Sequence, residues 1–494
     1  MKRIVAWLGV FALLAAGPVV FLVLERASGQ SGFPLDDAWI HQTYARSLAA
    51  GRGWSYAGGP ATAGSTSPLW TILQVPAFWL RIPPVAWSSA LGIGLLFVNA
   101  AWVRRWIGRA DPEASRYALF LGLVEWHLVW AALSGMETIL YCAWISAAVF
   151  FFFPLNSDIR WKDAPFPAIF LLGLLGGGGI WIRPEAVLLT GMILPTIVLR
   201  WKTIATGRRG IFLLGMIIPV AAYFLFQFSL SGRLLPNTFF VKSAEYSALT
   251  SISIFVRLLQ PWPALLAGPA AIAVLFVPAA VAALLRERRW TALVPAVWAA
   301  VHLAVYAVQL PATYQHGRYF LPLLPVLIGY GAYGYAVLRR RGETLLPARI
   351  VLRALGVSAA ALAAVFLWIG ARQFVRDVQT IEEIVAASKW IRDNTPADTV
   401  VAAHDIGALG FWGERRIVDL GGVTDLSAIP LLNGGVSLPE FLRRTAADLI
   451  MSMPVFYHDD LDDCVTVPGF PRGVSTLDED YQTLVYDWRT GCTW

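Results

Sequence analysis

Long apolar runs recur along the whole chain, and they decide what it can fold into. Of its 494 residues, 57% are hydrophobic and only 14% are charged, whereas about 25% are charged in typical soluble proteins. A helix that crosses a bilayer needs about 20 mostly apolar residues. Segments near this length, some interrupted by proline, are residues 4–24, 86–103, 115–133, 138–155, 165–182, 185–200, 211–230, 264–285, 291–310, 320–338 and 350–370. The sequence therefore predicts a polytopic α-helical membrane protein with about eleven transmembrane helices.

Clusters of basic residues between these runs predict the orientation of the chain. With the N-terminus inside, every predicted cytoplasmic loop carries such a cluster, as the positive-inside rule requires. The clusters are Lys2 and Arg3; Arg104, Arg105, Arg109 and Arg116; Arg160 and Lys162; Arg200, Lys202, Arg208 and Arg209; Arg286, Arg288 and Arg289; Arg339, Arg340, Arg341, Arg349 and Arg353. This placement explains the net charge of +7 without a nucleic-acid partner. No small-residue cleavage site follows the first run, so we expect a retained helix, and an odd number of spans places the C-terminus outside.

Residues 371–494 differ in composition from the rest of the chain and hold most of its acidic residues. Short strand-like runs at 399–403, 416–420 and 448–451 alternate there with helix-like stretches such as 381–391. We expect a membrane part over residues 1–370 and a small extracytoplasmic α/β domain over residues 371–494. Two cysteines in this domain, Cys464 and Cys492, could pair outside the cell, whereas Cys142 lies in an apolar run.

The first predicted outside loop, residues 25–85, holds the most unusual polar pattern. Asp36 and Asp37 are adjacent carboxylates directly after a membrane span. A carboxylate placed there can orient a hydroxyl or take its proton, with a pKa tuned by burial and nearby charge. The structural alternative is that Asp36 caps a helix beginning near Ala38. Later in the loop, residues 68–80 are apolar but too short to cross the membrane. Further polar candidates in this loop are His41, Tyr44, Ser65, Thr66 and Ser67.

The other predicted outside turns combine cations with carboxylates. They contain Glu137; Arg183 and Glu185; Asn237 and Lys242; and His316, Arg318 and Tyr319. Ionisable side chains near membrane depth are costly and usually mark function, and cations gathered there could neutralise a phosphate. The alternative is that the basic residues only extend their side chains to the membrane interface. His404 and Asp405 follow a predicted strand, either as a loop that reaches the site or as a simple turn.

Two features inside the spans are expected to be structural. Glu125 and His127 in the third span would form a buried pair, and the run Gly176–Gly179 would permit close helix packing or a helix break. No His/Cys spacing typical of zinc occurs, and the sequence requires no cofactor and predicts no metal ligands. The adjacent aspartates still leave room for a divalent metal.

Taken in order, these motifs resemble those of GT-C-fold glycosyltransferases. Asp36-Asp37-Ala38-Trp39-Ile40, followed by Gly-Ser-Thr-Ser-Pro-Leu-Trp at 64–70, is similar to the first-loop signature of that class. The resemblance is strongest to the terminal arabinofuranosyltransferase family of mycobacteria and its bacterial relatives. Further similarities are residues 134–138, 183–185, 236–239, 317–319 and the stretch from Asp405 to Asp425.

The resemblance implies an activity and a set of residue roles. A sugar would pass from a polyprenyl-phosphate donor to a glycan or glycolipid acceptor, outside the cytoplasmic membrane of a bacterium. The catalytic role falls on Asp36 first and Asp37 second. Donor-phosphate binding falls on Arg183, Lys242 and Arg318, with Glu185, His316 and Tyr319 beside them. Supporting roles fall on His41, Tyr44, Ser65, Thr66, Ser67, Glu137, Asn237, His404 and Asp405.

Two other functions stay open on the sequence. A transporter or flippase for lipid-linked glycans would place charged groups near the bilayer midplane and often contains inverted repeats, whereas these groups lie at one rim and no repeat is evident. A non-catalytic protein of envelope assembly would tolerate the substitution Asp36→Asn.

Overall fold

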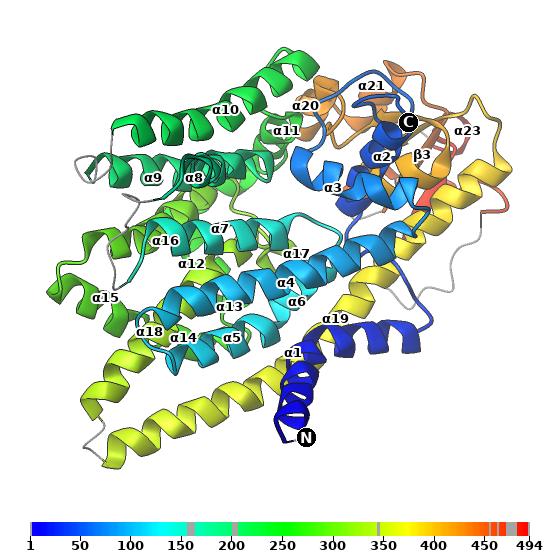
Figure 1. Cartoon of the computed structure of the whole chain (residues 1–494). Helices are drawn as coiled ribbons and strands as arrows, with labels where there is room; N and C mark the ends of the chain where they lie inside the picture. The colour runs from blue at the N-terminus through cyan, green and yellow to red at the C-terminus, as the bar shows by residue number, and fades with distance from the viewer. Residues whose placement is uncertain are drawn as a thin grey trace.

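The computed structural model describes residues 2–155, 164–199, 206–342, 346–453, 456–461, 464–470 and 482–492. Long helices form most of this body, and a smaller part with a β-sheet lies at one end of it, next to helices α2 and α3 (Figure 1). Four of the basic residues used to predict the orientation, Arg160, Lys162, Arg200 and Lys202, lie outside the described residues.

Helices occur at the position of each predicted span. The unbroken ones are α1 (Lys2–Ala27), α4 (Pro84–Gly108), α7 (Thr138–Phe152), α10 (Thr206–Ser231), α16 (Trp290–Gln309), α18 (Leu324–Gly342) and α19 (Leu346–Asn394). The others are divided: α5 (Ala114–Val124) and α6 (Trp126–Leu133); α8 (Phe166–Gly178) and η1 (Gly179–Trp181); η2 (Pro184–Ala186) and α9 (Val187–Leu199); α14 (Ala270–Val274) and α15 (Val277–Arg286). Among the described residues, five helices are long and apolar enough to cross a membrane by themselves. The count of about eleven spans therefore stays a prediction.

Large apolar side chains are exposed on the outside of the helical body. Leu171 of α8 is 62% exposed, Leu225 of α10 is 70% exposed and Val357 of α19 is 71% exposed. Each such side chain in water forgoes about 2 kcal/mol of burial free energy, and large apolar surfaces of this kind mark contact with lipid or protein. Together with the apolar helices, this surface is that of a multi-pass membrane protein.

Glycines allow α8 and α10 to pack closely. A side chain at Gly173 would collide with the backbone carbonyl of Phe212, and one at Gly177 would collide with that of Met216. The glycine run also ends α8, which passes into η1 at Gly179. Both alternatives predicted for residues 176–179 are therefore realised.

Glu125 and His127 form the expected buried pair. His127 Nδ1 lies 2.7 Å from Glu125 Oε1, and both side chains are almost completely buried. Glu125 also interrupts the helix between α5 and α6, and its Oε2 accepts the N–H of Ala270 at 2.8 Å. The carboxylate thus has a structural role, because it accepts a backbone N–H at the start of α14.

Short helices connect the longer ones. From the first loop come α2 (Asp37–Ala49) and α3 (Pro68–Trp79), the latter at the predicted non-spanning segment. Gln42 of α2 donates to Gln74 of α3 at 3.3 Å and to Ser88 of α4 at 3.1 Å, which fixes these three helices together. The remaining short elements of the membrane part are α11 (Asn237–Glu245), η4 (Ser247–Ser251), α12 (Ile254–Leu259), α13 (Pro261–Leu265), α17 (Tyr314–Gly317) and η5 (Leu321–Leu323).

Helix α19 is longer than the sequence predicted. The segment 381–391, expected as a separate helix, is instead the last part of one helix of 49 residues. Its composition changes from apolar to mixed near residue 371, but good helix formers continue without a break. The boundary expected at 370/371 therefore falls inside a helix, and the division into two domains stays a prediction.

A four-stranded sheet follows α19. The three expected strands are β1 (Val400–Ala403), β2 (Arg416–Asp419) and β3 (Leu449–Ser452), and a fourth, β4 (Leu484–Tyr486), was too short to predict. The order is β2-β1-β3-β4, with β1 parallel to β2 and β3, and β4 antiparallel to β3. Cys464 and Cys492 form a disulfide. The helical elements here are η6 (Leu409–Gly413), η7 (Leu426–Ala428), α20 (Ile429–Leu432), α21 (Leu438–Arg443), α22 (His458–Leu461) and α23 (Trp488–Gly491).

The segment after β1 packs against the first loop. Arg46 of α2 donates to the carbonyls of Phe411 (2.8 Å) and Gly410 (3.1 Å). The Tyr56 hydroxyl donates to the Ile406 carbonyl at 2.5 Å. Trp39 packs on Phe411, with ring centroids 4.8 Å apart. The hydrogen bonds among these contacts join residues 350 to 365 positions apart in sequence.

Candidate active site

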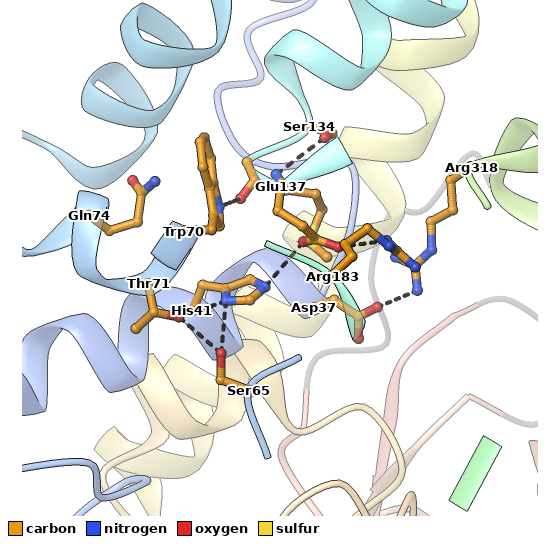
Figure 2. A network of polar contacts seen from close by, with 12 residues as sticks. Asp37, His41, Ser65, Trp70, Thr71, Gln74, Ser134, Glu137, Arg183 and Arg318 are labelled. Atoms are coloured by element: carbon orange, nitrogen blue, oxygen red, sulfur yellow. Dashed lines mark hydrogen bonds and ion pairs between the residues drawn. The ribbon is translucent and has the colours of Figure 1, made fainter. Parts of the chain in front are cut away.

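A cavity of about 390 Å³ lies where the predicted outside turns meet. Its polar residues come from several elements. These include the helices α2 and α11 and the turns before α7, α9 and η5. The polar residues of the cavity are Asp37, His41, Thr66, Glu137, Arg183, Glu185, Thr238, Lys242, Ser243, Tyr306, Gln309, Arg318 and Tyr319. Figure 2 shows several of these side chains converging from different elements.

Asp37 and Arg318 form an ion pair in the wall of this cavity. Arg318 Nη2 donates to Asp37 Oδ2 at 2.6 Å (Figure 2). It also donates to the Tyr319 hydroxyl at 3.0 Å. Asp37 is the first residue of α2, and its side chain is 37% exposed because it faces the cavity. Burial acts to raise the pKa of Asp37, but Arg318 and Lys242 outweigh it and hold this pKa below its ordinary value. The carboxylate is therefore ionised at neutral pH.

Not all hydrogen-bond donors of Arg318 are used within the described residues. It is only 5% exposed, and among the described residues its Nε and Nη1 have no hydrogen-bond partner. A buried guanidinium with open N–H groups costs free energy unless an anion accepts them. The geometry of the fork suits a phosphate, so the arrangement fits a site that an anionic ligand completes.

The backbone just before Arg318 is strained. Gln315, His316 and Gly317 all have left-handed conformations, with φ of 53°, 58° and 67°. Only glycine adopts such values without cost, and each other residue there costs roughly 1 kcal/mol or more. This turn carries Arg318 into the cavity.

Arg183 is held by two carboxylates. Its Nη1 donates to Glu137 Oε1 at 2.6 Å, its Nε donates to Glu185, and its Nη2 lies 3.2 Å from the Tyr306 hydroxyl. Tyr306 in turn donates to Glu185 at 2.6 Å. With two negative partners, this arginine is largely neutralised, so Arg318 and Lys242 provide more of the positive potential in the cavity.

A chain of polar contacts extends from Glu137 into the first loop. His41 Nε2 lies 3.5 Å from Glu137 Oε2, and His41 Nδ1 lies 2.9 Å from the Thr71 hydroxyl (Figure 2). Ser65 completes the chain, 3.0 Å from Thr71. Burial acts to raise the pKa of Glu137, but the contact with His41 and the charge of Arg183 lower it to about 2. His41 therefore lies beside a carboxylate that is ionised at neutral pH.

Lys242 of α11 lies in the cavity wall and contacts Glu245 at 3.0 Å. Burial acts to lower the pKa of Lys242, but Tyr314 and Glu245 raise it overall, so the ammonium stays charged. The rest of the cavity lining is apolar. Its apolar residues include Val187, Leu188, Leu235, Phe239, Val305 and Leu310. One cavity thus combines charged groups with an apolar surface, as an amphipathic ligand requires.

Asp36 does not line this cavity. It is only 8% exposed, and its carboxylate accepts the backbone N–H groups of Gly407 (2.6 Å) and Ala408 (2.7 Å). Burial and the neighbouring Asp405 raise its pKa, against the effect of these two donors. The predicted cap of its own helix is wrong, because Asp36 makes no side-chain hydrogen bond to α2. Asp36 instead holds the loop before η6 against the first loop.

Several other predicted site residues also lie off the cavity. His316 Nε2 contacts Asp377 of α19 at 2.7 Å, with the rings of Trp126 and Trp130 beside it. His404 stacks on Phe456 at 4.1 Å and lies 3.3 Å from Asp405. The others outside the lining are Tyr44, Ser65, Ser67 and Asn237; of these, Tyr44 contacts Thr62, Ser65 supports His41, and Asn237 donates to the Val423 carbonyl.

Tyr306 and Gln309 were missed because they lie within an apolar run that the sequence identifies only as a span. Their place in the last turn of α16, next to the predicted outer rim, was the available signal. Within the described residues no group of three or more His, Cys, Asp or Glu side chains gathers as a metal site would need. Asp37 already pairs with a guanidinium, and the proposal of a divalent metal stays untested.

Comparisons with known proteins agree with this fold. The chain superimposes on ArnT from Cupriavidus metallidurans bound to undecaprenyl phosphate with a TM-score of 0.59 and 14% identity, covering 97% of both chains. It superimposes on the archaeal oligosaccharyltransferase AglB from Archaeoglobus fulgidus, in complex with an inhibitory peptide and a dolichol-phosphate, with a TM-score of 0.50 and 12% identity, covering 90% of this chain and 69% of that one. The predicted GT-C-like fold is therefore confirmed.

Sequence comparison points to the same class. The terminal β-(1→2)-arabinofuranosyltransferase of Mycobacterium tuberculosis is 26% identical over 268 residues, which cover 52% of this chain and 41% of that protein. The matched region thus spans less than half of this relative. A domain of unknown function (DUF8728) matches residues 372–490. The resemblance predicted from the motifs is confirmed.

Proposed function

We propose that this chain is a membrane glycosyltransferase that transfers a sugar from a polyprenyl-phosphate donor to an extracytoplasmic glycan or lipid-linked acceptor. The observation that carries the proposal is one cavity whose lining combines Asp37, Arg318 and Lys242 with many apolar side chains. Both halves of a lipid phosphate would be matched there. Support also comes from two structural relatives, of which ArnT binds undecaprenyl phosphate and AglB was solved in complex with a dolichol-phosphate.

In the proposed reaction, the bond between the sugar's anomeric carbon and the phosphate oxygen breaks, and polyprenyl phosphate leaves with its negative charge. The open N–H groups of Arg318 and the Lys242 ammonium would stabilise that charge as it develops. A new bond forms between the anomeric carbon and an acceptor hydroxyl oxygen. The hydroxyl proton would pass to Asp37, which ranks above Asp36 because only Asp37 faces the cavity. Because the acceptor oxygen becomes acidic only as this bond forms, an ionised carboxylate of low pKa suffices as the base.

The proposed setting is the outer face of a bacterial cytoplasmic membrane. About eleven spans with the N-terminus inside would place the cavity and the sheet-containing region outside. The disulfide between Cys464 and Cys492 supports this orientation, because disulfides persist in oxidising compartments. The region over residues 371–494, which begins with the last part of α19, would then lie on the side from which the acceptor approaches.

The test uses purified full-length protein in nanodiscs with a panel of polyprenyl-phosphate sugars and an extract of cell-envelope acceptors. Release of free polyprenyl phosphate is followed for wild type, Asp37→Asn and the matched control Asp393→Asn, which changes an exposed carboxylate at the end of α19. We expect release by wild type and the control, and a loss of at least 100-fold, roughly the contribution of general acid–base catalysis, in Asp37→Asn.

No release of any donor by wild type would overturn the proposal and favour transport or a non-catalytic role. Release that survives in Asp37→Asn would keep the transfer reaction but remove Asp37 from it.

A further inference from the structure

A second large cavity lies at the other end of α4 from the candidate active site. This cavity, here called the arginine pocket, has a volume of about 660 Å³. Its lining residues are Ala101, Arg104, Arg105, Gly108, Arg109, Pro112, Ser115, Arg116 and Phe150. Ser88 near the start of α4 is bonded to Gln42 of α2, the helix that carries Asp37. Arg105 is 17 positions further along the same helix, which at 1.5 Å per residue is about 25 Å away. The arginine pocket and the cavity with Asp37 therefore lie at opposite ends of the bundle.

Among the residues that the structure describes, no carboxylate lines the arginine pocket. The two acids of the adjacent turn face elsewhere: Asp111 is bonded to Arg340 at 2.8 Å and Arg339 at 3.2 Å, and Glu113 to Arg339. Asp111 is also only 3% exposed and accepts the N–H of Ala114. Asp111 and Glu113 are thus neutralised by arginines of α18. Neither of these two acids neutralises the positive charge of the pocket.

Two of the lining arginines are held in place by aromatic rings. The Arg109 guanidinium lies 3.7 Å from the centroid of Phe150 and donates to the Phe150 carbonyl at 2.9 Å. The Arg105 guanidinium lies 5.0 Å from the ring of Trp102. Within the part of the chain that the structure describes, Arg104, Arg105 and Arg116 form no ion pair with a carboxylate. Planar guanidiniums fixed around a concave space are the usual means of holding phosphate oxygens.

We propose that the arginine pocket binds a phosphate-bearing anionic head group. The exposed apolar side chains of the helical body place this end of α4 at a membrane surface, where anionic phospholipids present such groups and attract arginines. A soluble polyphosphate has the same chemistry and is the other source. Arginines that only set the orientation of the chain in the membrane would attract anionic lipid through their net charge, wherever they lie. A binding site in the pocket would instead depend on the particular arginines that line it. The proposal does not depend on sugar transfer.

The test compares two double variants that remove equal charge. Arg104→Gln/Arg116→Gln changes the pocket, and Arg341→Gln/Arg353→Gln changes exposed arginines of the same predicted membrane side that do not line it. Full-length protein is released from nanodiscs of phosphatidylcholine doped with phosphatidylglycerol, and the retained lipid is measured by native mass spectrometry. In parallel, protein in detergent is titrated with sodium pyrophosphate by calorimetry.

We expect retention of phosphatidylglycerol by wild type and the control variant, and about 30-fold weaker retention by the pocket variant, since each arginine near an anionic surface contributes roughly fivefold. Tight pyrophosphate binding that is lost only in the pocket variant, without lipid retention, would assign the same site to a soluble anion. Equal loss in both double variants, or no binding of either probe to wild type, would overturn the proposal.

Discussion

Replacing Asp36 by asparagine should loosen the loop before η6 rather than abolish the chemistry. Each carboxylate oxygen of Asp36 accepts one buried backbone N–H, from Gly407 at 2.6 Å and from Ala408 at 2.7 Å. An asparagine side chain keeps one acceptor and turns an amino group toward the other N–H. Leaving one buried donor unsatisfied costs about 1–3 kcal/mol. At about 2 kcal/mol, local opening of this loop should become about 30-fold more frequent.

Hydrogen exchange followed by mass spectrometry reports this opening directly for the peptide over residues 404–413. We expect faster exchange there in Asp36→Asn, and unchanged exchange in Asp37→Asn, whose carboxylate contacts Arg318 instead of the loop backbone. Equal protection of the peptide in wild type and Asp36→Asn would refute this structural role. So would equally fast exchange in both variants.

Three further predictions follow from the packing and charges of the site. Arg318→Lys should raise the donor KM about tenfold in the polyprenyl-phosphate release assay, because the single ammonium nitrogen of lysine cannot pair with Asp37 and also present a planar two-nitrogen fork to the phosphate; an unchanged KM would contradict the role of the open N–H groups. Gly177→Ala should destabilise the protein by at least about 1 kcal/mol in thermal unfolding, since its Cβ would meet the Met216 carbonyl, whereas Gly178→Ala, with open space around it, should not. The lowered pKa of Glu137, about 2 against an ordinary 4.5, contributes stability above pH 4.5 that is lost as the pH falls toward 2, about 3 kcal/mol in all. Wild type should therefore lose more stability than Glu137→Gln in that pH range; parallel curves would contradict it.

Much of the site could be predicted because membrane topology restricts where polar groups can lie. Once the apolar runs and basic loops fix the sides, the turns with Glu137, Arg183, Lys242 and Arg318 must share one rim. The cavity gathers these four residues, together with Asp37 from the first loop.

The details depend on local conformation that composition does not reveal. Successive residues at a helix start point in different directions, and only Asp37 of the two aspartates lines the cavity, which the sequence alone could not show. The left-handed run at 315–317 turns His316 toward α19 while Arg318 enters the cavity. Tyr306 is indistinguishable from its apolar neighbours in the sequence, because only the fold places Glu185 next to its hydroxyl.

The measurement that tests the central claim most directly is a cryo-electron microscopy structure of the full-length protein with polyprenyl phosphate bound. We predict the phosphate within about 3 Å of Nε or Nη1 of Arg318, near Lys242, with the prenyl chain along the apolar wall formed by Val187, Leu188 and Phe239. A phosphate found only elsewhere, with this cavity empty at saturating lipid, would contradict the account.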